Sequence, residues 1–230
     1  MSQWVKLKPV CHQVAIAGRV IDAEKNQAIP GDAEKNQAIP GARVQITKMP
    51  PEYETWLNHH KLQYGSNWNQ MVERPDRRRT AADGSFYFMD LPDGEYILTA
   101  SLPSAGTRYG TYKEPITVSR QDGNINASWE EGGNLAVNIA LQPTAIKGQI
   151  TSNNKNNEAV VMAKVQVEGS SEYTFSNSEG NYLLSGLEAP SQRTVKVSVS
   201  AFGYQSACQS IKISRGEVKI ANFSLLKLTN

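Results

Sequence analysis

The fold is indicated most strongly by residues 80–96, which read TAADGSFYFMDLPDGEY. The Asp-Gly pair at 83–84 is a hairpin-type turn signal, because glycine reaches positive φ at no steric cost. Alternating apolar residues follow it, and their spacing predicts a strand with Phe86 and Phe88 on one face and Tyr87 on the other. Short strands separated by Gly, Pro and Asp turns predict an all-β sandwich.

The pattern of strands and turns occurs twice along the chain. Four segments of the first half are matched in order by four of the second: 17–20 by 147–150, 41–46 by 162–167, 83–91 by 179–187, and 135–141 by 220–226. Ordered matches at similar spacing indicate a duplicated module. We therefore predict an N-terminal arm at 1–13, a first sandwich at 14–142 and a second at 143–230, with Gln142-Pro143-Thr144 as the linker.

Both modules resemble the carboxypeptidase regulatory-like family. The first carries the resemblance on Thr80, Asp83, Gly84, Phe86, Phe88, Leu91, Pro92, Gly94 and Tyr96, and the second on Gly180, Tyr182, Leu184 and Leu187. The second departs from the family pattern where Glu188-Ala189-Pro190-Ser191 replaces the Pro-x-Gly turn. The resemblance implies two tandem seven-stranded Greek-key sandwiches of the transthyretin-like type. It implies no enzyme, because in the carboxypeptidases the similar module is the accessory one.

Composition narrows the class of function. The chain has 230 residues and a formal net charge of +2, which does not suggest a nucleic-acid-binding protein. Its two cysteines, Cys11 and Cys208, form no disulfide framework and are expected to be free thiols, with a bridge between the chain ends as the alternative. The sequence shows no apolar run of signal-peptide or transmembrane length, so we expect a cytoplasmic protein without membrane contact. A mature secreted form with a replaced start is the alternative.

Two insertions interrupt the first module. Residues 22–31 recur unchanged as 32–41, and we interpret this duplication as a neutral surface loop. Residues 49–79 replace a short connection of the family. Pro50-Pro51 and the nearby acidic residues predict a helix start, and Gly65 predicts its end.

The second insertion is the predicted protein-binding site. Its aromatic and apolar residues have the composition of an interface core, and its arginines would form a charged margin for an acidic partner. The predicted site comprises Tyr53, Trp56, Leu57, Tyr64, Trp68, Met71, Arg77, Arg78 and Arg79. The alternative is that the aromatic stripe packs against its own sandwich and that the arginines are a solvated face.

The sequence contains no convincing catalytic, metal or cofactor site. His59 and His60 are adjacent, so on a helix they diverge by about 100° and cannot hold one metal ion together. No phosphate-binding glycine loop or nucleophile elbow occurs. A covalent alternative is an isopeptide bond between Lys147 and Asn222. Related sandwiches in Gram-positive surface proteins form Lys–Asn bonds of this kind.

The sequence as a whole predicts a non-catalytic structural or protein-interaction scaffold. We expect it to bind a protein partner within a larger assembly, for which a phage-tail-like contractile machine is one setting. One alternative is a carbohydrate-binding module, with Tyr64, Trp68, Tyr109 and Tyr112 as stacking residues. Another is an adhesin-like spacer, which would require export.

Overall fold

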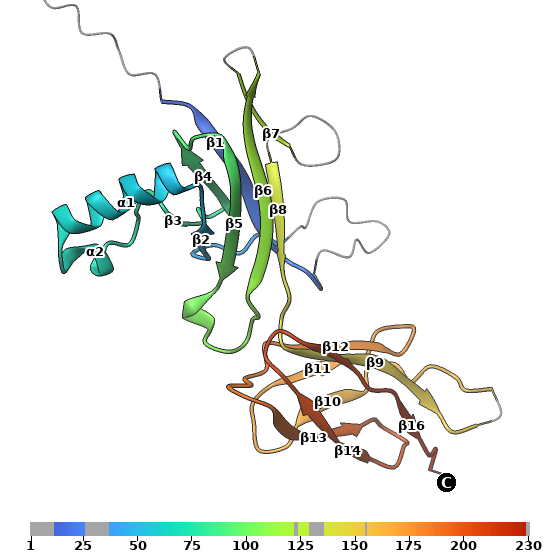
Figure 1. Ribbon diagram of the computed structural model, residues 1–230. Helices are drawn as coiled ribbons and strands as arrows, with labels where there is room; N and C mark the ends of the chain where they lie inside the picture. Colours follow the sequence, from blue (N-terminus) through green and yellow to red (C-terminus); the bar gives the residue numbers. More distant parts are fainter. Residues whose placement is uncertain (1–11, 26–36, 122–123, 129–135, 155, 229–230) are drawn as a thin grey trace, which may run out of the picture. The chain divides into compact units, whose positions relative to one another are not determined.

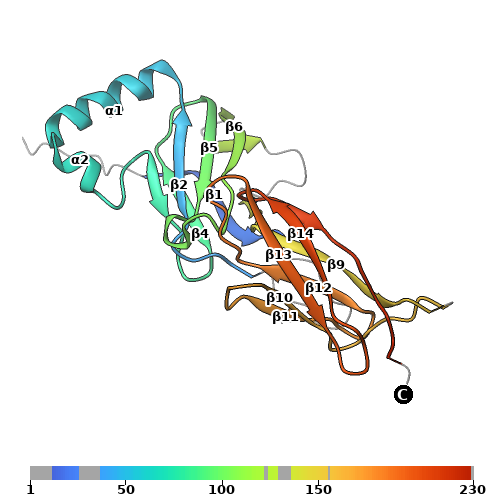
Figure 2. The same ribbon diagram turned by 90° about the horizontal axis from the view of Figure 1, so that it is seen from below.

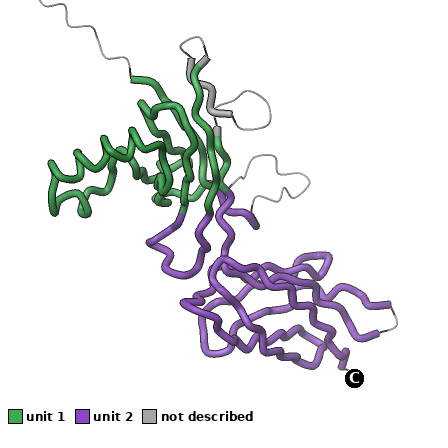
Figure 3. Tube along the Cα trace, in the orientation of Figure 1, with its two compact units in different colours: residues 1–20, 38–100, 113–139 green, residues 21–37, 101–112, 140–230 purple. Residues whose placement is uncertain are grey.

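The structure, a computed structural model, describes residues 12–25, 37–121, 124–128, 136–154 and 156–228. The chain divides into two compact units (Figure 3). Unit 1 comprises residues 1–20, 38–100 and 113–139, and unit 2 comprises residues 21–37, 101–112 and 140–230. The described residues do not include Cys11, residues 1–11 of the predicted arm or residues 26–36 of the duplicated loop. The predicted boundary at 142–143 stays a prediction.

Unit 1 is built on two sheets with the strand orders β4-β1-β8 and β3-β2-β5-β6-β7 (Figure 1). Their bounds are β1 Val14–Asp22, β2 Arg43–Lys48, β3 Arg77–Arg79, β4 Ser85–Met89, β5 Gly94–Ser101, β6 Tyr112–Gln121, β7 Asn124–Ser128 and β8 Ala136–Leu141. Between β2 and β3 lie the helices α1 (Pro51–Tyr64) and α2 (Asn67–Gln70), and a 3₁₀ turn η1 (Pro103–Ala105) follows β5.

Unit 2 is a second pair of sheets, with the orders β12-β9-β15 and β11-β10-β13-β14 (Figure 2). Its strands are β9 Ala145–Ser152, β10 Lys164–Val167, β11 Tyr173–Phe175, β12 Asn181–Ser185, β13 Arg193–Ser200, β14 Ala207–Ile213, β15 Val218–Ile220 and β16 Phe223–Leu225. Both β15 and β16 pair with β9 in parallel. Buried residues from both sheets form one apolar core.

These sheets confirm the all-β class with two sandwiches and a helical insertion in the first. Two details differ from the sequence expectation of seven strands each. In unit 1, β6 continues into the short antiparallel partner β7. In unit 2, the last predicted strand is interrupted between β15 and β16, where Ala221 and Asn222 lie outside both strands, although the Ala221 N–H still donates to the Lys147 carbonyl at 2.8 Å.

A buried hydroxyl ties the edge of each sandwich together. In unit 1 the Thr80 Oγ1 accepts a hydrogen bond from the Ala42 N–H at 2.8 Å and donates one to the Ile39 carbonyl at 2.6 Å. In the same place in unit 2, a serine makes the matching pair of bonds: Ser176 Oγ accepts from the Ala163 N–H at 2.9 Å and donates to the Val160 carbonyl at 2.6 Å. The repeated contacts support the interpretation of a duplicated module.

The first prediction concerns strand β4, whose burial alternates as the sequence predicts. Phe88 is fully buried, whereas the neighbouring Tyr87 is 54% exposed. Phe88→Ala should lower the free energy of unfolding of unit 1 by about 3–5 kcal/mol, because it leaves a cavity in the core. Tyr87→Ala is the matched control and should cost less than about 1 kcal/mol. Urea unfolding checks both, and equal losses would contradict the assigned faces.

Candidate functional site

Helix α1 begins and ends where the sequence predicts. Pro50 is the N-cap residue and Pro51 is the first helical residue, where the missing proline N–H costs no helix bond. Two acidic residues lie in the first turn and Lys61 in the last, which suits the helix dipole. Gly65 ends the helix with a positive φ of 54°.

One side of α1 is packed against its own sandwich. Tyr53 and Leu57 are buried, and the Tyr53 hydroxyl donates to the Pro75 carbonyl at 3.1 Å. The Tyr53 ring meets the buried Tyr96 ring edge-on at 6.2 Å. Burial raises the pKa of the Tyr53 phenol well above its ordinary value, with the Asp76 carboxylate as the second cause. Tyr53 therefore stays a neutral hydrogen-bond donor.

A glycine lets the helix start approach strand β5. Gly94 has a φ of 144°, and a Cβ on it would lie only 2.4 Å from the Pro50 Cγ. The proline that begins α1 therefore rests directly on the turn before β5. This contact fixes the entry of the helix relative to the sheet.

Most arginines of the insertion make contacts within unit 1. Arg77, Arg78 and Arg79 form strand β3 and pair with β2, so they belong to the sheet and not to a free margin. The Arg77 guanidinium donates to the Met71 carbonyl, and burial followed by repulsion from Arg74 lowers its pKa. The Arg78 guanidinium donates to a backbone carbonyl and pairs with a glutamate, Glu73, at 3.3 Å.

The most buried arginine, Arg74, forms the internal anchor of the insertion. Its guanidinium makes two hydrogen bonds to the Asp76 carboxylate, at 2.9 and 2.8 Å, and both side chains are buried. It also lies 4.9 Å from the centre of the Trp68 ring. Trp68 is buried beneath this guanidinium, with Tyr64 6.1 Å away on the helix.

A groove lies beside α1, and we call it the α1 groove. It has a volume of about 480 Å³. One wall carries Trp56, which is 42% exposed and stacked on Tyr53 with ring centres 5.3 Å apart. Prolines and a methionine supply further apolar lining, namely Pro75, Pro92 and Met89. Its size and apolar lining are typical of binding clefts.

The polar margin of the α1 groove carries the carboxylates of Glu52 and Asp90 as well as basic side chains. Asp90 has a φ of 57° and binds the chain before β1: it accepts from the Gln13 N–H at 2.9 Å and contacts His12 Nδ1. These bonds, the backbone one first, lower the pKa of the Asp90 carboxyl. Glu52 also lines the groove, and its carboxylate has no partner among the described residues.

The structure thus separates the nine residues of the predicted site. Tyr53, Leu57 and Trp68 are buried in unit 1, whereas Trp56 and Tyr64 are exposed and Met71 is partly buried. The three arginines of β3 line the sheet, and only Arg78 reaches the α1 groove. Apart from Arg78, sequence reasoning missed the non-helical residues of the groove, since they come from three separate segments, His12, Pro75 and Met89–Pro92.

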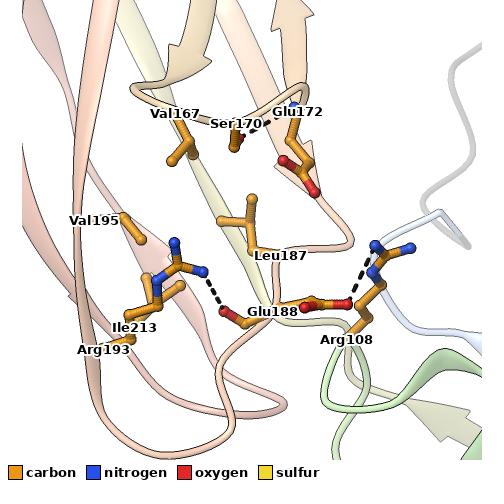
Figure 4. A pocket seen from close by; sticks show the side chains of 9 residues that line it. All are labelled: Arg108, Val167, Ser170, Glu172, Leu187, Glu188, Arg193, Val195 and Ile213. Carbon is orange, nitrogen blue, oxygen red and sulfur yellow. Dashed lines mark hydrogen bonds and ion pairs between the residues drawn. The ribbon is translucent and has the colours of Figure 1, made fainter.

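A smaller pocket lies in unit 2 (Figure 4). Its floor consists of Val167, Leu187, Val195 and Ile213, and its volume is about 190 Å³. Arg108 pairs with the Glu188 carboxylate at 3.3 Å and Arg193 donates to the Glu188 carbonyl at 3.2 Å (Figure 4). Hydrogen bonding to Ser170 lowers the pKa of Glu172 at the rim. The pocket is smaller than ordinary ligand sites.

The sequence predicts no metal site in the part of the chain that the structure describes. That part contains no group of three or more His, Cys, Asp or Glu side chains able to hold a metal ion. His60 Nδ1 contacts the Trp56 carbonyl instead. Among the described residues, no helix is long and apolar enough to cross a membrane.

Two sequence alternatives concern other residues. Lys147 Nζ lies 2.9 Å from the Glu24 carboxylate, while Asn222 Oδ1 accepts from the Gln149 N–H, so the two expected isopeptide partners are engaged separately. The Tyr64 and Trp68 rings are tilted by 36° and Trp68 is buried, so this pair offers no flat platform for a sugar. The Tyr109 hydroxyl donates to Asp22, and Tyr112 is partly buried.

Sheets and cores together define a β-sandwich protein with a helical insertion in unit 1. Residues 146–230 match the family described as CarboxypepD_reg-like domain. The second copy expected from the sequence is thereby confirmed, and the first stays a prediction. No curated protein matches the chain.

Several solved structures are similar to the chain at low identity. A type II cohesin–X-dockerin complex, an interface mutant from Acetivibrio cellulolyticus, is 15% identical over 35% of this chain and 51% of that chain, with a TM-score of 0.26. The match thus spans about half of that chain. Shaft pilin SpaA from Lactobacillus rhamnosus GG is 13% identical over 96% of this chain and 99% of its own, with a TM-score of 0.36.

Minor pilin GBS52 from Streptococcus agalactiae is 14% identical over 94% of this chain and 96% of its own, with a TM-score of 0.27.

The second prediction concerns the buried Arg74–Asp76 pair. Arg74→Leu should lower the free energy of unfolding by about 3–5 kcal/mol, because it leaves the Asp76 carboxylate buried without its partner. It should also shift tryptophan fluorescence to the red by uncovering Trp68. Arg79→Ala, at an exposed position of β3, is the control and should change stability by less than about 0.5 kcal/mol. If urea unfolding showed that Arg74→Leu leaves the free energy of unfolding unchanged, the Arg74–Asp76 pair would not anchor the insertion.

Proposed function

We propose that the chain is a non-catalytic β-sandwich scaffold of the adhesive type and that it binds a partner protein in the α1 groove. The observation that carries this proposal is Trp56, which is 42% exposed although its ring is held in a fixed orientation by stacking on Tyr53. Aromatic residues of this kind dominate the energy of protein interfaces, particularly when they lie beside a pocket.

The way Tyr53 is held supports a preorganised site. Tyr53 is fixed from below by Tyr96 and by its bond to the Pro75 carbonyl. Trp56 stacks on this fixed ring, so binding would immobilise little that is not already ordered. A site that is ordered before binding loses less conformational entropy when the partner arrives.

The charges of the groove favour an apolar partner segment that carries a lysine or arginine. Glu52 has no partner among the described residues, whereas Arg78 is paired with Glu73 and Asp90 is bound to His12 and the Gln13 N–H. A cation beside the apolar segment would therefore meet the Glu52 carboxylate. This replaces the acidic partner that the arginine run suggested.

The wider setting stays a set of predictions. An adhesin-like spacer fits the tandem sandwich units, and a larger assembly such as a phage-tail-like contractile machine fits a docking surface on one of them. The cytoplasmic location is likewise a prediction.

The third prediction tests the docking surface by quantitative pull-down from the native source. Trp56→Ala should weaken capture of the partner by about thirtyfold or more, because interface anchors typically contribute about 2 kcal/mol or more. The melting temperature should stay unchanged, because Trp56 lies outside the core. Glu52→Gln should weaken capture mainly at low salt.

Leu62→Ala is the matched control, because Leu62 lies on the same helix and is 80% exposed but does not line the groove. It should bind as the unaltered chain does. If Trp56→Ala lowers the melting temperature and leaves capture of the partner unchanged, the insertion only packs on its own sandwich and the proposal fails.

A further inference from the structure

A second groove lies in unit 2, and we call it the amide groove. It has a volume of about 750 Å³ and is lined by strands β9, β11 and β12, by Ile220 of β15 and Asn222 after it, and by Glu24 and Lys25 after β1. In the sheet, Gln149 is opposite Asn181 and Lys147 is opposite Leu183, so these four side chains share the outer face. The groove is separate from the α1 groove, which is formed by unit 1 alone.

Four side-chain amides of this groove are each held at one end by the protein. The Gln149 Nε2 donates to the Glu179 carbonyl and the Asn181 Nδ2 to the Glu179 carboxylate, both at 3.0 Å. Asn177 Oδ1 accepts from the N–H groups of Glu179 and Asn181, and Asn222 Oδ1 accepts from the Gln149 N–H at 2.9 Å. These bonds determine which end of each amide is oxygen and which is nitrogen.

The other end of each amide has no partner among the described residues. The free atoms are two acceptors, on Gln149 and Asn181, and two donors, on Asn177 and Asn222. A hydroxyl group both donates and accepts, so a ligand rich in hydroxyls matches a mixed set of this kind. Because the amides are already oriented, their ordering adds little cost on binding.

A glycine places Asn222 at the groove. A Cβ on Gly148 would lie 1.9 Å from the Ala221 carbonyl oxygen and 2.9 Å from Asn222 Oδ1. Only glycine therefore permits this segment to approach β9 so closely. The break between β15 and β16, which left Asn222 outside the ladder, thus gives the groove one of its donors.

Apolar surface lies beside the amides. Phe175 lines the groove, is 45% exposed and meets the exposed Tyr173 edge-on at 5.7 Å. Tyr173 in turn lies under the Lys164 ammonium at 5.0 Å. Ile220 is exposed on the strand that pairs with β9. Exposed aromatic and aliphatic groups suit the C–H faces of a sugar ring.

The charged groups of the groove are largely paired with one another or with its amides. Lys147 pairs with Glu24 at 2.9 Å, and the Glu179 carboxylate accepts from Asn181. Lys25 also lines the groove without an ion-pair partner among the described residues, but one ammonium cannot clamp a phosphate between two cations. From the oriented amides, the apolar rim and the paired charges, we infer that the amide groove is a binding site for a neutral oligosaccharide.

The fourth prediction is tested on the full chain by calorimetric titration with maltohexaose, cellohexaose, mannohexaose and chitohexaose. At least one should bind. Phe175→Ala should weaken that binding by about tenfold or more, the effect of losing about 1.4 kcal/mol of contact. Asn222→Asp keeps the Oδ1 acceptor for the Gln149 N–H but removes the free donor, and it should weaken binding comparably.

The control is Phe202→Ala, a fully exposed residue of unit 2 outside the groove, which should bind as the unaltered chain does. Trp56→Ala should also bind the sugar normally, so failure of the docking proposal would not affect this result. Absence of binding to all four sugars at millimolar concentration would overturn the inference. So would binding that Phe175→Ala leaves unchanged while the variant stays folded.

Discussion

The architecture of both units depends on one buried hydroxyl that joins two segments far apart in sequence. In unit 1 it is Thr80, and in unit 2 it is Ser176. Each donates to one carbonyl and accepts from one N–H, so three polar groups that sandwich closure buries are satisfied at once. A buried polar group without a partner would cost about 1–3 kcal/mol. The chain that enters strand β2 or β10 is therefore fixed against the turn that precedes β4 or β12.

Because these hydrogen bonds hold each sandwich together, segments outside its core can carry binding surfaces. In unit 1 most arginines of the long insertion and two of its aromatic residues attach it to the sandwich, with Arg74 covering Trp68 and Tyr53 packed on Tyr96. Trp56 and Tyr64 stay exposed, and of these two Trp56 lines the α1 groove. In unit 2 the binding surface is instead the outer face of a sheet, where Gly148 lets the segment after β15 approach β9 closely. The two modules share a fold while their grooves differ in both position and chemistry.

The sequence was informative where chemistry is local. The turn at 83–84 and the alternation around Phe88 predicted the strands, and proline and glycine predicted the ends of α1. It was uninformative where the outcome depends on distant partners. The arginine run suggested a basic margin, but Asp76 neutralises Arg74 in a buried pair. The amide groove combines residues far apart in the sequence, such as Gln149 and Asn222, which are 73 positions apart, and single residues of this kind carry no periodic signal.

The central claim is that Trp56 is an ordered, exposed anchor for a partner, and fluorine NMR tests it most directly. The chain can be labelled with 5-fluorotryptophan, and Trp56→Phe and Trp68→Phe identify two of the resonances. In the free chain, the Trp56 signal should respond to exchange of H2O for D2O and the buried Trp68 signal should not. In the complex with the captured partner, the Trp56 signal should move and lose that response, while Trp68 stays unchanged. A complex in which the Trp56 signal keeps its position and its solvent response would contradict the account.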